Sequence, residues 1–285
     1  MKKIIKLQKR PAITAILFII LTFIGGTGCK KPSPSPTPTS SPGSLIFHFH
    51  TYVGNIEDTV AQHPLLSQDG IPTKLYFSNI FISNIRLITA AGDTIAPLKD
   101  TIVLKHWDEE TYPLGPVPAG NYKTVKFDVG IPASINHTSP GQYASSEPYS
   151  DLNAFWYGNQ NEMWSGSTTN GYIFANIMGY VDSSSHPSPT DSATQPFSYQ
   201  IGGDQNRITI LMPEQDFTVT SGIPWTVHMT IDFAYFLHGL NLKTQNTCNF
   251  VTNPALAAQM AKNITAYTVD SAYVSQKAMF KYEPN

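Results

Sequence analysis

Alternation of apolar and polar residues, from Leu45 to the end of the chain, constrains the fold more than any other feature. It is clear in segments such as "TKLYFSN", "YKTVKFDVGI", "YIFANIMGYV" and "WTVHMTIDF". Turn-forming stretches such as "AAGDT", "VPAGN" and "IGGDQN" separate these segments. Because a period of two places alternate side chains on opposite faces of a strand, the sequence predicts an all-β protein built as a single antiparallel β-sandwich.

One helix and two long loops interrupt this pattern. The stretch "NPALAAQMAKNITAY", Asn253 to Tyr267, combines a capping asparagine, a proline suited to the first turn and an apolar stripe, which predicts a C-terminal helix. The alternation weakens over residues 136–170 and 182–195, where we expect long loops. A last strand is expected in "SAYVSQKAMFKYE".

The N-terminus has the pattern of an export signal. Five basic residues and no acid precede a 13-residue apolar run, Ala12 to Ile24, which is too short to cross a bilayer as a helix. "GGTGC" follows and resembles a bacterial lipobox ending at Cys29. We therefore expect residues 1–29 to be a signal segment and Cys29 to carry lipid. In the alternative, the protein is an ordinary secreted protein and Cys29 has no such role.

Residues 30–43, "KKPSPSPTPTSSPG", contain five prolines and predict an extended linker of about 40 Å between the lipid and a domain spanning 44–285. No acidic run follows Cys29, which favours the periplasmic side of the outer membrane over the cell surface. With Cys29 lipidated, Cys248 is the other of two cysteines and no disulfide is expected.

Charge and motifs exclude several function classes. The chain has 18 Lys and Arg against 20 Asp and Glu, and five of the cations lie in the signal segment. The mature chain is therefore acidic and lacks the basic clusters that bind nucleic acid. No nucleophile elbow, H-E-x-x-H motif, phosphate loop or haem-attachment motif is present. We expect no enzymatic activity.

Two histidines stand two residues apart in "LIFHFHTYV". In a strand, His48 and His50 share one face while Phe47 and Phe49 take the other. Two imidazoles on one face can chelate a metal ion. The alternative is that both histidines form a solvated surface over a phenylalanine core.

Three further groups of residues each have two possible roles, one structural and one in binding a metal or a ligand. His228 and Asp232 share the face of a strand opposite Trp225, and either form structural hydrogen bonds or support a metal. Trp156 and Trp164 either pin their long loop or stack on a ligand. Met163 offers a thioether to copper or packs in the core. The acids of "HWDEE", residues 106–110, predict a solvated turn.

Five segments in a fixed order carry a family resemblance: "SNIFISNIRLITAAGDTI", "PLGPVPAGNYKTVKFDVGIP", "NEMWSGSTTNGYIF", "FSYQIGGDQNRITILMP" and "TVHMTIDFAYFLHG". Together they resemble the MbnP-like copper-binding protein domain family, named after the methanobactin-associated MbnP. The resemblance implies an extracytoplasmic β-sandwich that binds copper. In studied relatives a diheme partner of the peroxidase type oxidises a tryptophan to kynurenine, which forms the copper site with histidines.

Carried over residue by residue, the resemblance places Met163 and Trp164 at the family's Met-Trp element and Gln200 at a position where relatives have histidine. Gly166 and Thr51 also stand where the family has a tryptophan and a histidine. We expect a lipid-anchored copper-binding protein, with His48, His50, Met163, Trp164 and Gln200 as candidate metal residues. The alternative is a metal-free binding module for a carbohydrate, a peptide or an envelope partner.

Overall fold

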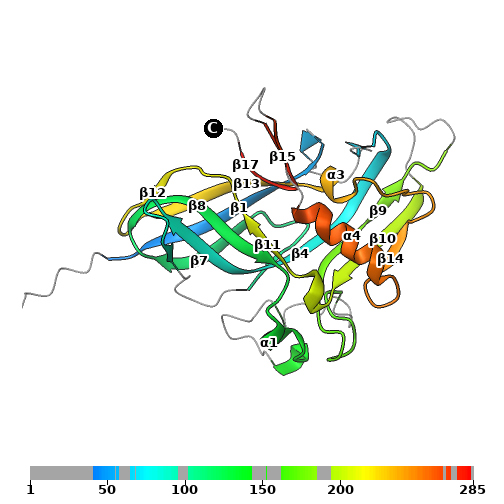
Figure 1. Cartoon of the computed structure of the whole chain (residues 1–285), viewed down its shortest axis with the longest axis horizontal. Coiled ribbons are helices and arrows are strands. Elements are labelled where there is room, and N and C mark those ends of the chain that lie inside the picture. Colours follow the sequence, from blue (N-terminus) through cyan, green and yellow to red (C-terminus); the bar gives the residue numbers. More distant parts are fainter. Residues whose placement is uncertain are drawn as a thin grey trace, which may run out of the picture. The chain divides into compact units, whose positions relative to one another are not determined.

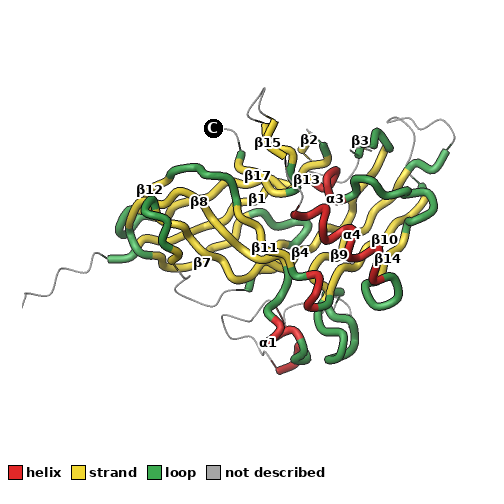
Figure 2. Tube along the Cα trace, in the orientation of Figure 1, coloured by secondary structure: helices red, strands yellow, loops and turns green. Residues whose placement is uncertain are grey.

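The computed structural model describes residues 41–54, 56–57, 65–67, 69–95, 102–142, 152, 162–184, 194–265, 268–270 and 275–283. Strands dominate these residues (Figure 2). Among them, none of the helices has the length and apolarity needed to cross a membrane. The signal segment, Cys29, most of the linker and Trp156 lie outside the described residues.

Two sheets carry most of the fold (Figure 1). The first has the order β17 (Phe280–Tyr282), β13 (Pro224–Asp232), β1 (Gly43–Val53) and β2 (Ile56–Glu57), and β7 (Thr111–Val117) also pairs with β1. The second has the order β11 (Ile208–Leu211), β8 (Gly120–Val129), β4 (Pro72–Thr89), β9 (Ile173–Val181), β10 (Gln195–Gly202) and β14 (Thr247–Asn249).

In the described part of the chain, four short strands extend the second sheet, and two others form a separate hairpin. The strand β12 (Phe217–Val219) pairs with β8, while β3 (Leu65–Leu66), β5 (Thr94–Ile95) and β6 (Val103–Lys105) pair with β4. The last strand expected from the sequence is instead divided into β16 (Ser275–Lys277), which pairs with β15 (Thr268–Asp270), and β17.

The sequence prediction of an all-β fold is confirmed, with one correction. The pairings are not purely antiparallel, because β1 runs parallel to β13 and β10 runs parallel to β14. The physical reason is that both pairs join strands from distant parts of the chain, which are not constrained to the antiparallel course of a hairpin.

The expected helix is present as α4 (Pro254–Thr265), which contacts β10, β11 and β14. The other helical segments are short: α1 (Ala133–Asn136), η1 (Pro140–Gln142), η2 (Asp204–Asn206) and α3 (Phe233–Phe236).

The main hydrophobic core lies between the two sheets, and a second, smaller hydrophobic cluster is also present. The main cluster includes Phe47, Phe49 and Phe127, all fully buried. A second cluster contains Phe81, Met163 and Tyr172, with Trp164 packed against it. The two clusters lie on opposite faces of β4 and β9, because Ile80 and Ile82 belong to the main cluster and Phe81 between them to the second, as the period of two predicts.

Candidate metal centre

The first strand positions the two histidines. Burial alternates strictly along β1, so Phe47 and Phe49 are fully buried while the side chains of His48 and His50 are 21% and 25% exposed. The two aromatic rings of the buried pair contact each other edge to face. Because the core holds the strand from one side, both imidazoles are fixed on the opposite side with limited freedom.

The two imidazoles are in direct contact. Nε2 of His48 lies 2.8 Å from Nε2 of His50, and the ring centroids are 4.6 Å apart. Since one ring must donate and the other accept in this contact, the two histidines adopt different tautomers when both are neutral.

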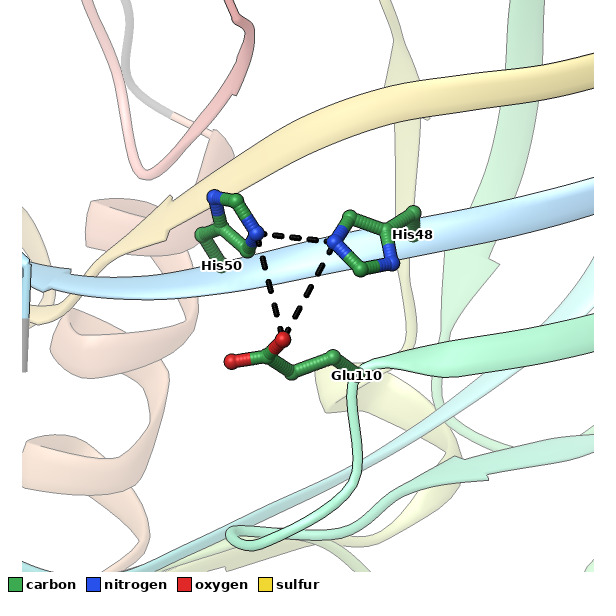
Figure 3. Close-up of side chains that lie close together, drawn as sticks. All are labelled: His48, His50 and Glu110. Carbon is green, nitrogen blue, oxygen red and sulfur yellow. Dashed lines mark hydrogen bonds and ion pairs between the residues drawn. The ribbon is translucent and has the colours of Figure 1, made fainter. Parts of the chain in front are cut away.

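A carboxylate completes a triangle with these two nitrogens (Figure 3). Oε2 of Glu110 lies 3.9 Å from Nε2 of each histidine. Glu110 directly precedes β7, and its carbonyl accepts a hydrogen bond of 2.8 Å from the amide of Phe49. His48, His50 and Glu110 are therefore held together by backbone pairing and could jointly hold a metal ion.

The Nδ1 atoms of the two rings face different groups. Nδ1 of His48 lies 2.9 Å from Oγ1 of Thr111. Oε1 of Glu283 lies 2.7 Å from Nδ1 of His50, although this buried oxygen makes no hydrogen bond of good geometry with any described residue. In a neutral His50 ring, this oxygen favours a proton over a lone pair on Nδ1, and Nε2 then keeps its lone pair.

With this tautomer of His50, Nε2 of His48 donates to Nε2 of His50, and Nδ1 of His48 accepts from the hydroxyl of Thr111. In that arrangement Nε2 of His50 can bind a cation directly, whereas His48 binds one through Nε2 only with its proton on Nδ1. The threonine hydroxyl allows that tautomer, since it can accept as well as donate.

More ionisable groups surround the triangle. His228 is the register partner of His48 on β13, and the two ring centroids are 5.1 Å apart. Nδ1 of His228 lies 3.8 Å from Oε2 of Glu283, and Oε1 of Glu57 lies 3.7 Å from Nδ1 of His50. Three carboxylates therefore face the two central imidazoles, an arrangement that favours a bound cation.

Asp232 has a structural setting. It is fully buried, its Oδ1 accepts from the amides of Gly54 and Ala234, and its Oδ2 lies 3.0 Å from Nζ of Lys281. Trp225, on the same strand, differs from the sequence prediction. It is 38% exposed, whereas Val227 and Met229, which alternate with it on the same face, are buried. It lies where β13 begins, beyond the pairing with β17.

The remaining candidates lie on the second sheet and its loop. Met163 is fully buried in the second cluster, and Trp164 contacts Tyr172 edge to face at 4.7 Å. Oε1 of Gln200 accepts a hydrogen bond of 2.9 Å from Asn249. The structure thus brings His48 and His50 together, and it places Met163, Trp164 and Gln200 in other contacts.

Thr51 also makes a defined hydrogen bond. Thr51 points inward from β1, and its hydroxyl accepts a hydrogen bond of 3.1 Å from Nζ of Lys105, which is fully buried. The amino group of Lys105 also donates to the carbonyl of His106. A lysine amino group next to Thr51 disfavours a metal cation at that position.

Sequence reasoning missed Glu110, Thr111 and Glu283 as neighbours of the histidines. Glu110 belongs to the "HWDEE" segment, where the sequence predicted a solvated turn, and 49% of its side chain is indeed exposed. Its proximity to β1 depends on the register of β7 against β1. No local pattern encodes that register, so the sequence held no signal for this contact.

Comparisons with known proteins agree with this architecture. A sequence model of the MbnP family matches residues 42–250. The chain belongs to the MbnP family. A solved structure titled MbnP from Methylosinus trichosporium has a TM-score of 0.50 and 14% sequence identity, covering 72% of this chain and 82% of that chain. A search of curated proteins finds no match. The structural likeness supports the MbnP-like fold, while the candidate residues rest on the geometry above.

Proposed function

We propose that this member of the MbnP family is a lipid-anchored, extracytoplasmic protein that binds copper without catalysing a reaction, and that His48, His50 and Glu110 hold the ion. The observation that carries the proposal is the triangle formed by Nε2 of His48, Nε2 of His50 and Oε2 of Glu110. Family membership makes copper the metal to test.

The triangle has the dimensions of a chelating site. A point in its plane about 2.0 Å from each nitrogen, a usual metal–imidazole distance, lies about 2.2 Å from Oε2 of Glu110. The two nitrogens subtend an angle of about 90° at that point, as neighbouring ligands of a tetragonal ion do. The distances among the three donors are therefore compatible with one ion, which the two rings would face after turning away from their mutual hydrogen bond.

The donor set favours copper(II). Imidazole nitrogen and carboxylate oxygen suit copper(II), which also binds such ligands more tightly than other divalent ions of the first row. Thr111 and Glu283 would orient the two rings through their Nδ1 atoms, the role of outer partners at histidine metal sites. When bound, copper would supply a positive charge among the surrounding carboxylates.

Thr51 and Gln200, two positions at which the family has histidine, are poor candidates for copper ligands. Thr51 is engaged by Lys105 and Gln200 is engaged by Asn249, so both are already hydrogen-bonded. Neither threonine nor glutamine is a preferred copper ligand. The proposal therefore places copper on the outer face of β1.

Copper binding can be tested directly. We expect isothermal titration to give one copper(II) per chain and the electron paramagnetic resonance spectrum to show nitrogen coupling. The His48→Ala/His50→Ala double variant should lose the site, whereas His238→Ala, which changes an exposed histidine elsewhere, should retain it. Unchanged affinity in the double variant would rule out the proposed ligands.

The anchor is a separate part of the proposal, because Cys29 lies outside the described residues. Support comes from the signal-like N-terminus and the cysteine that ends it. Labelling cells with a fatty-acid analogue should mark the protein, and Cys29→Ser should abolish both the label and membrane association. Protease treatment of intact and of lysed cells would test the expected periplasmic orientation, because a protein on the periplasmic side should be degraded only after lysis.

A diheme partner remains an expectation tied to Trp164. Co-expression with a peroxidase-type diheme protein, followed by mass spectrometry of the intact chain, tests whether Trp164 is oxidised. Because Trp164 does not belong to the proposed copper triangle, the proposal predicts that copper binds without this modification.

A further inference from the structure

A groove separates the two sheets on the side of β13 away from β1. One wall is the segment Gln215–Phe217, which leads into β12, and the other is formed by Trp225–His228 of β13 together with Tyr282 and Glu283. Its volume is about 590 Å³, within the range of small-molecule sites. The groove approaches the metal centre at His228 and Glu283 but includes none of the three proposed copper ligands.

A stack of aromatic rings forms one end of this groove. Phe217 stacks on the buried Tyr122 at 5.5 Å, and Trp225 lies parallel to Phe217, with an interplanar angle of 8° and centroids 5.9 Å apart. The stack thus begins in the core and ends at Trp225, which is 38% exposed. An exposed indole held in this way is already ordered, so a ligand that packs on it costs little side-chain entropy.

Polar side chains with free hydrogen-bonding capacity line the same groove. Among the described residues, the side chains of Gln215 and Asp216 make no hydrogen bond or ion pair, whereas Glu283 is already paired with His50 and His228. A carboxylate and an amide without partners therefore stand beside the aromatic stack. They can accept several hydrogen bonds from a ligand rich in hydroxyl or amine groups.

The charge of the lining restricts the ligand further. Among the described residues that line the groove there is no lysine or arginine, while Asp216 and Glu283 are acidic. A phosphate, sulfate or carboxylate would meet like charge and find no lysine or arginine among the described lining residues, where His228 is the one imidazole and already faces Glu283. A ligand without negative charge is favoured.

We propose that this groove binds a neutral or amino sugar. A pyranose ring has an apolar face of C–H groups, which would pack on the indole of Trp225, and a rim of hydroxyl groups, which would donate to Asp216 and Gln215. This binding site is distinct from the copper centre and goes beyond the function proposed above. It requires no metal, because the groove contains none of His48, His50 or Glu110.

The site can be tested on the purified full-length protein after metal removal with a chelator. The probes are an array of neutral, amino and acidic oligosaccharides, followed by titration calorimetry with chitotriose, cellobiose and maltotriose. We expect binding of at least one neutral or amino sugar, and Trp225→Ala should weaken it by about tenfold or more. Trp107→Ala, which removes a tryptophan of similar exposure outside the groove, should leave the affinity unchanged.

Two further variants keep the test decisive if Trp225→Ala disturbs folding. Trp225→Phe should retain part of the affinity, and Asp216→Ala, at an exposed position, should reduce it while leaving the melting temperature unchanged. The proposal is overturned if no neutral or amino sugar binds, if only acidic sugars bind, or if Trp225→Ala and Asp216→Ala both bind as the parent does. Loss of copper binding alone would affect only the function proposed above.

Discussion

Oδ2 of Asp232 lies 3.0 Å from Nζ of Lys281, and the carboxylate in this pair is fully buried at the end of β13. Its other oxygen accepts from the amides of Gly54 and Ala234, so one side chain joins the end of β1, the start of α3 and the strand β17. Asp232 therefore satisfies three donors that would otherwise lack partners at a junction of three elements.

Replacing Asp232 with alanine should lower the free energy of unfolding by about 3 kcal/mol or more, because two backbone amides and an ammonium group lose their acceptor. Most of this cost comes from the buried amides, since the Lys281 side chain is 21% exposed and solvent screens its pairing. Urea denaturation measures the effect. The control is Asp93→Ala, an exposed turn residue, which should stay within about 0.5 kcal/mol of the parent; an equal loss in both variants would contradict this role.

The contrast between β1 and its surroundings shows how far the sequence can predict this site. Alternation in "LIFHFHTYV" was sufficient to place Phe47 inward and His48 outward, because the side-chain period is a local property of a strand. Glu110 and Glu283 reach the histidines only through pairings between strands that are distant in sequence. Such registers follow from the packing of the whole domain, so no local pattern could predict them.

A second ion pair should make stability depend on pH. Nε2 of His137 lies 3.0 Å from Oδ2 of Asp204, and Nδ1 lies 2.7 Å from the carbonyl of Thr168. The hydrogen bond to Asp204 and then that to Thr168 raise the pKa of His137 above its usual 6.5, because only the protonated ring can donate to both. Burial raises the pKa of Asp204, but hydrogen bonds from His137 and Asn136 outweigh it and leave the value below 3.8.

These two shifts define a pH window. The raised pKa of His137 gives stability that is fully present below pH 6.5 and is lost as the pH rises through the folded-state value. The lowered pKa of Asp204 gives stability that is present above pH 3.8 and is lost as the pH falls through its folded-state value. His137→Ala should therefore cost most between these limits, by about 0.5 kcal/mol because both side chains are exposed to screening.

Urea unfolding of the parent and His137→Ala at pH 5.5 and pH 9 measures this dependence. The difference between the two proteins should be larger at pH 5.5, and it should shrink in high salt. In an Asp204→Asn background, the substitution at His137 should lose most of its pH dependence. A difference that stays constant from pH 5.5 to pH 9 would show that the pair does not act electrostatically.

Cys248 should be a slow thiol in the folded protein. The residue is 3% exposed in the main core, and burial raises the pKa of its thiol to about 11. At pH 8 only about one thiol in a thousand would then be a thiolate, the form that reacts. In a Cys29→Ser background, iodoacetamide should label Cys248 slowly in buffer and rapidly in urea. Thr220→Cys, at an exposed position, provides a fast-reacting control, and equally fast labelling of Cys248 in buffer would contradict its burial.

Thr111 offers the sharpest test of how the copper centre accepts an ion. Its hydroxyl lies 2.9 Å from Nδ1 of His48, and a neutral His48 that binds copper through Nε2 carries its proton on Nδ1. Valine has the shape of threonine but no hydroxyl, so Thr111→Val removes the protein acceptor of the protonated Nδ1 and leaves it to solvent. We expect the copper(II) affinity to fall by about tenfold, the usual effect of losing an outer partner of a histidine ligand.

The control is Thr111→Ser, which keeps the hydroxyl and should retain most of the affinity. Competition with a chelator of known affinity measures all three proteins, and equal affinities for the parent and Thr111→Val would show that His48 does not need this partner.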